Sequence, residues 1–121
     1  MMHVHLVFVT KYRRDVFTPE MINVLKQYFA RICRNMEAEL VECDGEDDHV
    51  HLLINYPPKL SISKLVNALK GATSHKMKNH FPQLHKHFWK RNLWSPSYFA
   101  GSCGGAPLDL VKQYVQKQRI E

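Results

Sequence analysis

The first apolar residues of the chain recur at every second position. Val4, Leu6 and Phe8 lie on one side of this pattern, and the positions around and between them are His3, His5, Val7 and Val9. A period of two with β-branched residues predicts a strand. The spacing becomes helical after Thr18-Pro19-Glu20, which supplies an N-cap hydroxyl, a proline at the first helical position and an acid in the first turn. A helix is therefore predicted from here to about Met36.

The middle of the chain predicts a hairpin followed by a second helix. Leu40-Val41 begins one strand, Asp44-Gly45 has turn chemistry, and Asp48 to Tyr56 forms the next strand. Pro57-Pro58 ends the hairpin. Ser61 or Ser63 then caps a helix whose inner face is Ile62, Leu65, Val66 and Leu69. Phe81-Pro82 interrupts this helix, and a short helical turn around residues 84–88 follows.

The last part of the chain predicts one more strand and one more helix. Leu93 to Cys103 is aromatic and β-prone, with Pro96 as an edge or bulge feature. Gly104-Gly105 is a break, and Pro107 opens a helix to about Gln118. The order β-α-β-β-α-β-α predicts an α+β fold of the ferredoxin-like split βαβ class. Its antiparallel four-stranded sheet has the first and third strands at the centre, both helices on one face, and the C-terminal helix as an addition.

Composition places the chain among ordinary globular proteins. Its 121 residues suit one domain, with 45% apolar and 23% charged residues. The first apolar stretch is too short for a signal peptide or a membrane helix, so we expect a cytoplasmic protein without a membrane partner. The three cysteines form no CxxC pair and indicate small buried hydrophobes. The net charge of +6 suggests an anionic partner without specifying it.

Two spacings suggest a metal site next to a nucleophile. His49 and His51 are two residues apart on the third strand, so both imidazoles face the side opposite to the helices. Tyr114 and Gln118 are four residues apart, so they share one face of the final helix. Two imidazoles and an amide oxygen suit one metal ion, and tyrosine can form covalent intermediates. Spacing alone nevertheless favours an ordinary surface histidine pair and a Tyr114 that packs against the sheet.

Several segments, in matching order over nearly the whole chain, resemble the single-tyrosine HUH transposases of bacterial insertion sequences that move as single strands. They are Val9-Thr10-Lys11-Tyr12-Arg13-Arg14, Asp48-His49-Val50-His51-Leu52-Leu53, Leu69-Lys70-Gly71, Leu93-Trp94-Ser95-Pro96-Ser97-Tyr98-Phe99 and Gly104-Gly105. This resemblance implies that His49, His51 and Gln118 are metal ligands and that Tyr114 is the catalytic nucleophile. It divides the single domain, 1–121, into a ferredoxin-like core, 1–103, and a Gly-Gly hinge with the tyrosine helix, 104–121.

The same resemblance implies the reaction and its partners. The expected enzyme cleaves and rejoins single-stranded DNA at hairpin-flanked element ends, through a 5′-phosphotyrosine intermediate, with Mg²⁺ or Mn²⁺. An obligate homodimer is implied, in which the tyrosine helix of one subunit can serve the histidines of the other. The nucleic-acid-binding candidates are the basic residues Lys11, Arg13, Arg14, Lys70, Lys76 and Lys78, each of which could equally be a solvated charge.

Other residues leave alternatives open. Tyr12, Trp94, Tyr98 and Phe99 could stack on bases, although core packing is favoured for Trp94 and Phe99. Asp47 and Asp48 are interpreted as solvated turn residues, with ligand orientation or water binding as the alternative. His3 and His5 repeat the spacing of His49 and His51, so four histidines could instead form a zinc site. The competing functions are therefore a nucleic-acid-binding domain without chemistry and a zinc-binding regulatory domain.

Overall fold

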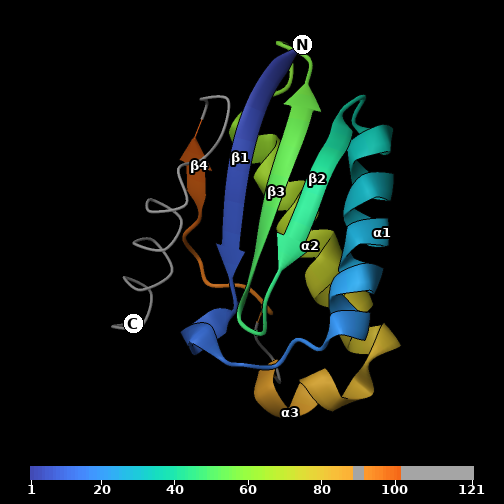
Figure 1. The fold of residues 1–121 in the computed structure, drawn as a ribbon, viewed down its shortest axis with the longest axis vertical. Coiled ribbons are helices and arrows are strands. Elements are labelled where there is room, and N and C mark those ends of the chain that lie inside the picture. Colours follow the sequence, from blue (N-terminus) through green and yellow to red (C-terminus); the bar gives the residue numbers. More distant parts are fainter. Residues whose placement is uncertain (89–91, 102–121) are drawn as a thin grey trace.

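The computed structural model describes residues 1–88 and 92–101, and the final helix predicted from the sequence lies outside this part. The elements, in chain order, are β1 (Met2–Val9), η1 (Lys11–Arg13), α1 (Pro19–Asn35), β2 (Glu39–Gly45), β3 (His49–Tyr56), α2 (Ile62–His80), η2 (Pro82–Leu84), α3 (His85–Phe88) and β4 (Phe99–Gly101) (Figure 1). The predicted order of strands and helices is confirmed for the described residues.

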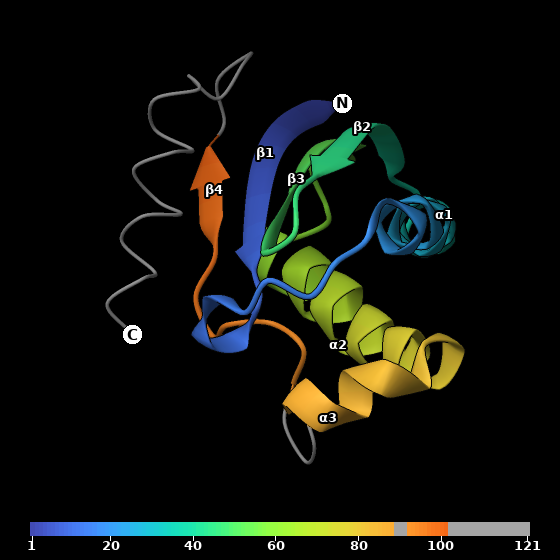
Figure 2. The same ribbon diagram turned by 60° about the horizontal axis from the view of Figure 1, so that its bottom comes forward.

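The four strands form one antiparallel sheet in the order β2-β3-β1-β4. The prediction that the first and third strands lie together at the centre is confirmed. Both long helices cover the same face of the sheet (Figure 2). The α+β fold with a split βαβ sheet is therefore the fold of the protein.

The core lies between the sheet and these helices. Its largest fully buried side chains come from every layer: Phe8, Leu6, Phe29, Leu25, Leu52, Ile54, Leu65, Leu69, Met77 and Trp94. On β3 the buried positions alternate with partly exposed ones, because successive side chains of a strand point to opposite faces. One face of β3 is thus committed to the core, and the other is left available for a site.

Both long helices begin at the predicted residues. The Oγ1 atom of Thr18 accepts a hydrogen bond from the amide of Met21 at 3.2 Å, and Pro19 occupies the first turn of α1. Of the two candidate caps for α2, Ser61 is the one used, since its Oγ accepts from the amide of Lys64 at 3.2 Å. Each cap satisfies one of the amides that a helix start leaves without an intrahelical partner.

The fourth strand is shorter than predicted within the described residues. Only Phe99–Gly101 pairs with β1, while Trp94 makes an isolated bridge to Thr10. Pro96 lacks an amide hydrogen and cannot continue a ladder. The carbonyl oxygens of Ser95 and Ser97 instead accept from the Lys70 ammonium. The amide of Ser95 still donates to the carbonyl of Val9, so the predicted strand from Leu93 is interrupted after Ser95 and continues as a ladder only at Phe99–Gly101.

Within residues 1–88 and 92–101, no helix is both long enough and apolar enough to cross a bilayer.

Candidate functional site

The histidine pair lies on the face of β3 that the helices leave open. Val50 and Leu52 point into the core, whereas His49 and His51 alternate with them and are partly exposed. Opposite them across the ladder stand Val9 and Val7 of β1. The predicted orientation of the two imidazoles is therefore confirmed, while their role as metal ligands stays a prediction.

Asp48 holds the ring of His49. The Nδ1 atom of His49 lies 2.8 Å from Oδ1 of Asp48, and the Nε of Arg13 donates to the other carboxylate oxygen at 2.6 Å. The Asp48 side chain is only 6% exposed. Its interpretation as a solvated turn residue was wrong, because Arg13 and His49 provide the partners that let a carboxylate be buried. Asp47 is exposed, as predicted for a turn residue.

His51 has a different neighbour. Its Nε2 atom lies 3.0 Å from Nδ1 of His5, and the two rings are stacked with centroids 5.2 Å apart. Burial lowers the pKa of His51, and the neighbouring His5 lowers it further. A neutral imidazole keeps a lone pair for a metal ion, so the environment of His51 favours the ligand form. A metal at the Nε2 atom would have to displace the His5 contact, because this nitrogen has one lone pair.

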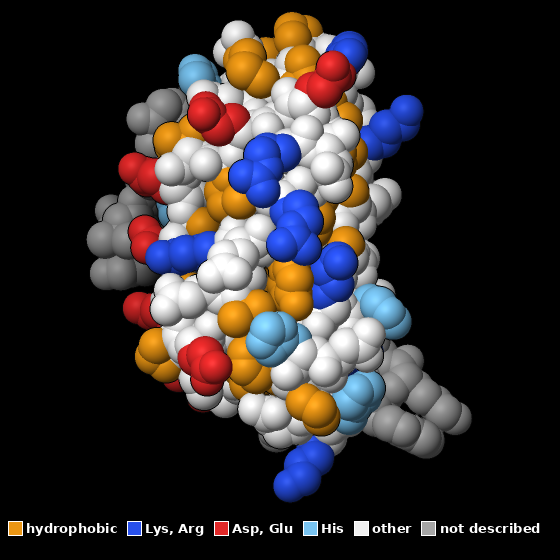
Figure 3. Space-filling model, turned by 90° about the vertical axis from the view of Figure 1, so that its right-hand side faces the viewer, with side chains coloured by type: hydrophobic (Ala, Val, Ile, Leu, Met, Phe, Trp, Pro, Cys, Tyr) orange, Lys and Arg blue, Asp and Glu red, His pale blue; other side chains and the backbone are white. Residues whose placement is uncertain are grey.

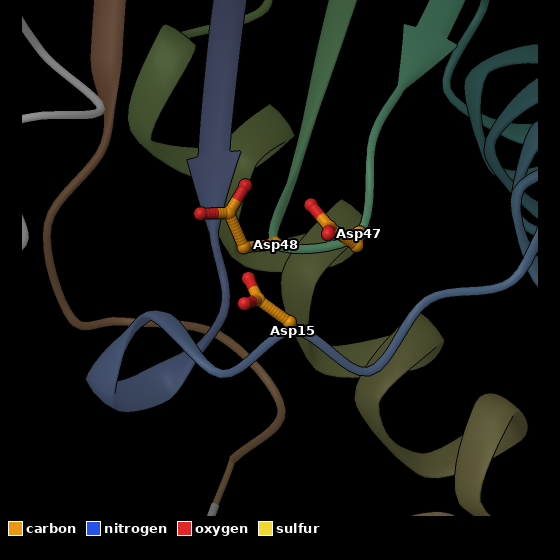
Figure 4. A group of neighbouring side chains, drawn as sticks. All are labelled: Asp15, Asp47 and Asp48. Carbon is orange, nitrogen blue, oxygen red and sulfur yellow. The ribbon is translucent and has the colours of Figure 1, made fainter.

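The four histidines do not gather into one cluster. The Nδ1 atom of His3 contacts Oδ1 of Asn55, His5 contacts His51, and His49 contacts Asp48. In the part of the chain that the structure describes, the residues whose ligand atoms converge are Asp15, Asp47 and Asp48. These carboxylates come together below the end of β1 (Figure 4). A zinc site built from His3, His5, His49 and His51 is therefore not supported by this arrangement.

Several of the basic candidates have partners inside the protein. Arg13 binds Asp48, the Lys78 ammonium donates to the carbonyl of Phe88 at 3.1 Å, and the Lys76 ammonium lies 5.5 Å from the centroid of the Tyr28 ring. Arg14 lies over the ring of Tyr12, which is 53% exposed. Further Lys and Arg side chains cross the middle of the face over α1, with histidines nearer the α3 end (Figure 3).

Lys11 and Lys70 share a pocket of about 260 Å³. Asn67 and Asn92 also line it. The Lys70 ammonium donates to the carbonyl oxygens of Ser95 and Ser97 at 2.6 and 3.3 Å. Burial lowers the pKa of Lys70, and the charge of Lys11 lowers it further. Two ammonium groups that repel each other beside amide donors form an environment that favours an anion.

The structure brings together residues that the sequence did not connect. The contact of Arg13 with Asp48 joins segments far apart in the chain, so spacing could not reveal it. The repeated spacing had placed His5 near His51 only as part of a possible zinc site, and the structure shows the two as a stacked pair. One signal was present, since Asp48 directly precedes the first residue of β3. Trp94 is 1% exposed, which confirms core packing over base stacking.

The remaining predicted site residues lie outside the described residues. These are Tyr114 and Gln118, together with the Gly104-Gly105 hinge, Cys103 and Pro107. The division of the domain after residue 103 falls there as well. Their roles and placement stay predictions.

Comparison with known proteins assigns the whole chain to one family. Residues 1–118 match the model of the IS200-like transposases. The chain is 33% identical over 114 residues to the ISDra2 transposase TnpA of Deinococcus radiodurans, covering 94% of this chain and 81% of that protein. It is 30% identical over 117 residues to the transposase of insertion sequence IS200 of Salmonella typhimurium, covering 97% of this chain and 76% of that protein.

Solved structures agree with these matches. The crystal structure of a protein assigned as a transposase from Deinococcus radiodurans R1 superposes with a TM-score of 0.89 at 35% identity, covering 97% of this chain and 90% of that one. A REP-associated tyrosine transposase bound to a REP hairpin shares the fold, with a TM-score of 0.59 at 14% identity over 94% of this chain and 62% of that one. The chain therefore belongs to the IS200-like family of single-tyrosine HUH transposases.

Proposed function

We propose that this transposase cleaves and rejoins single-stranded DNA at hairpin-flanked element ends, with Tyr114 as nucleophile and Mg²⁺ or Mn²⁺ as cofactor. His49, His51 and Gln118 are the proposed metal ligands. The observation that carries the proposal is the placement of His49 and His51 on the open face of β3, in a chain of this family.

The donor set of the described residues suits a divalent ion. His49 contacts Asp48 through Nδ1, which leaves its Nε2 atom for a ligand. The lowered pKa of His51 favours its neutral form. When bound, the ion supplies Lewis-acid stabilisation of the scissile phosphate and a template for in-line attack. Neutral histidine and amide ligands leave the charge of the ion available to the phosphate.

In the proposed reaction, Tyr114 exchanges one phosphodiester for another. Its phenol loses a proton, and the oxygen attacks the scissile phosphorus. The bond from phosphorus to the 3′ oxygen breaks, and this oxygen takes up a proton to become a free 3′-hydroxyl. The downstream strand stays linked to Tyr114 through its 5′ phosphate, and attack of a 3′-hydroxyl on this phosphotyrosine reverses the step and rejoins DNA. No external energy source is needed, because one ester replaces another.

Lys11 and Lys70 are the described residues best placed to contact the DNA backbone. They face one pocket with Asn67 and Asn92, and a phosphate there would reduce the repulsion between the two ammonium groups. The REP-associated transposase, which shares the fold, is bound to a REP hairpin, and this supports a hairpin as the DNA partner. A homodimer with shared active sites is part of the same proposal.

The nucleophile is tested by trapping the covalent intermediate. We expect the purified protein, incubated with Mn²⁺ and a labelled hairpin carrying single-stranded flanks, to form an adduct that survives a denaturing gel. Tyr114→Phe should abolish this adduct, since it lacks the attacking oxygen. Tyr28→Phe is the matched control, because the Tyr28 hydroxyl contacts His80 on the helical side of the sheet.

Two results would contradict the enzyme proposal. One is an absence of adduct with wild-type protein despite a shift of the hairpin in a native gel, which would indicate a binding domain without chemistry. The other is an equal yield of adduct from Tyr114→Phe and wild type.

A further inference from the structure

We infer that Asp48, clamped by Arg13, is the positioning residue for His49 in the metal site. The inference rests on the proposed function in one respect, the role of His49 as a metal ligand. Arg13 then holds the Asp48 carboxylate, whereas the sequence had suggested a contact with a DNA phosphate.

Asp48 is anchored through both its side chain and its main chain. One carboxylate oxygen accepts from Nε of Arg13 at 2.6 Å, and the other lies 2.8 Å from Nδ1 of His49. The carbonyl of Asp48 accepts from the amide of Thr10 at 2.9 Å, which ties it to the end of β1. The residue is 4% exposed. The carboxylate cannot swing away from the imidazole without breaking its contact with Arg13, and the main chain of Asp48 is held by Thr10.

This arrangement determines which nitrogen of His49 faces the solvent side. A carboxylate accepts hydrogen bonds, so Nδ1 must carry the hydrogen in the contact with Asp48. The lone pair is then on Nε2, and the plane of the ring is held by the carboxylate. A metal ion would meet a ligand that already has the required tautomer and direction.

The backbone that carries Arg13 has an unusual conformation. Tyr12 and Arg13 both have positive φ angles, 60° and 52°. Residues other than glycine rarely adopt this conformation, because it brings the Cβ atom close to the backbone. From this turn the Arg13 side chain reaches Asp48, where its charge offsets that of a buried carboxylate. The Arg13–Asp48 ion pair therefore accounts for the unusual conformation of this turn.

His51 provides an internal contrast. Its observed nitrogen contact is the imidazole of His5, whereas His49 has the carboxylate of Asp48. Loss of Asp48 should therefore act on the ligand at position 49 and leave the His5–His51 stack in place. An intact His5–His51 stack in such a variant would show that the effect is local to His49 and that the surface of the sheet is not generally disrupted.

The test is Mn²⁺ affinity of the full chain without DNA, measured from the electron paramagnetic resonance signal of free Mn²⁺. Asp48→Asn keeps the side-chain size but offers one acceptor oxygen for two donors, and we expect about 10–100-fold weaker binding. Arg13→Gln should weaken binding in the same direction, and it keeps the test valid if Asp48→Asn does not fold. Glu46→Gln is the matched control, because it removes the same charge from an exposed residue that lies outside the Asp15, Asp47 and Asp48 group.

A second measurement separates positioning from simple destabilisation. Nitrogen-15 NMR of the imidazoles in the metal-free protein should show His49 as the tautomer with hydrogen on Nδ1. Asp48→Asn should shift this population while the His51 signals stay unchanged. Equal Mn²⁺ affinities for Asp48→Asn and Glu46→Gln, with an unchanged tautomer, would overturn the inference. Wild-type affinity in His49→Ala would instead overturn the proposed metal site.

Discussion

Cys33 and Cys43 show how burial acts on single residues. Both are free thiols in the buried part of the structure, as their isolation in the sequence predicts. Burial raises the pKa of Cys33 to about 11 and that of Cys43 to about 12. The cause is the cost of placing a thiolate in apolar surroundings, so these residues act as small apolar side chains.

The cysteine pKa values predict a loss of stability in alkaline solution. Below about pH 8 the thiols are almost fully protonated in both the folded and the unfolded chain, and they add little pH dependence. Between about pH 8 and pH 11 the unfolded chain loses these protons while the folded one largely keeps them, so the free energy of unfolding falls. Urea unfolding from pH 8 to pH 11 measures this fall.

Because tyrosine and lysine side chains also titrate in that range, the comparison with Cys43→Ala isolates the thiol. The variant should lose less stability than wild type as the pH rises. Parallel pH profiles for the two proteins would contradict the assignment.

At the scale of elements, α2 is joined to the segment before β4 by buried hydrogen bonds. The indole Nε1 of Trp94 donates to Oγ1 of Thr73 at 3.0 Å, and the amide of Leu93 donates to Oγ of Ser74 at 2.8 Å. The Thr73 hydroxyl itself donates to the carbonyl of Leu69 at 2.6 Å. These contacts hold residues 93 and 94 against α2, while the amide of Ser95 donates to the carbonyl of Val9 at the end of β1.

Removal of the Thr73 hydroxyl tests this junction. We expect Thr73→Val to lower the free energy of unfolding by about 1–3 kcal/mol, because it leaves the buried indole hydrogen of Trp94 without its acceptor. Thr73→Ser keeps the hydroxyl and should lose less. Urea denaturation followed by tryptophan fluorescence provides the measurement, and equal losses in the two variants would contradict the role of the hydrogen bond.

At the scale of the whole molecule, the net charge of +6 attracts the proposed DNA partner. Many of its basic side chains have internal or aromatic partners, so formal charge overstates the number of phosphate contacts. Lys11 and Lys70 also have such partners, but they are two ammonium groups that line one pocket. Their mutual repulsion supports the choice of this pocket for a backbone phosphate.

Salt dependence of DNA binding tests that choice. Lys11→Gln should weaken binding of a hairpin with single-stranded flanks and lower the slope of log affinity against log salt by about 0.7, the value for one single-strand contact. Lys59→Gln is the control, because Lys59 pairs with Glu37 beyond the opposite end of β3. Fluorescence anisotropy at several salt concentrations gives both quantities. If Lys11→Gln and Lys59→Gln have the same slope of log affinity against log salt, Lys11 does not contact a DNA phosphate.

Much of the fold could be predicted from local patterns along the chain. The alternation on β1 and β3, the caps at Thr18 and Ser61, and the interruption at Phe81-Pro82 depend on neighbouring residues, whose spacing is visible in the sequence. For the same reason the sequence was sufficient to place His49 and His51 on the face opposite to the helices.

Contacts between distant segments could not be predicted in this way. The burial of Asp48 depends on Arg13, which lies 35 positions earlier, and the segment before β4 is bound by Lys70 and Thr73 of α2. A polar group enters the interior only when partners meet its hydrogen bonds, and those partners are assembled by packing of the sheet and helices. Pattern along the chain thus located the metal-ligand candidates, whereas tertiary packing determined which side chains hold them in place.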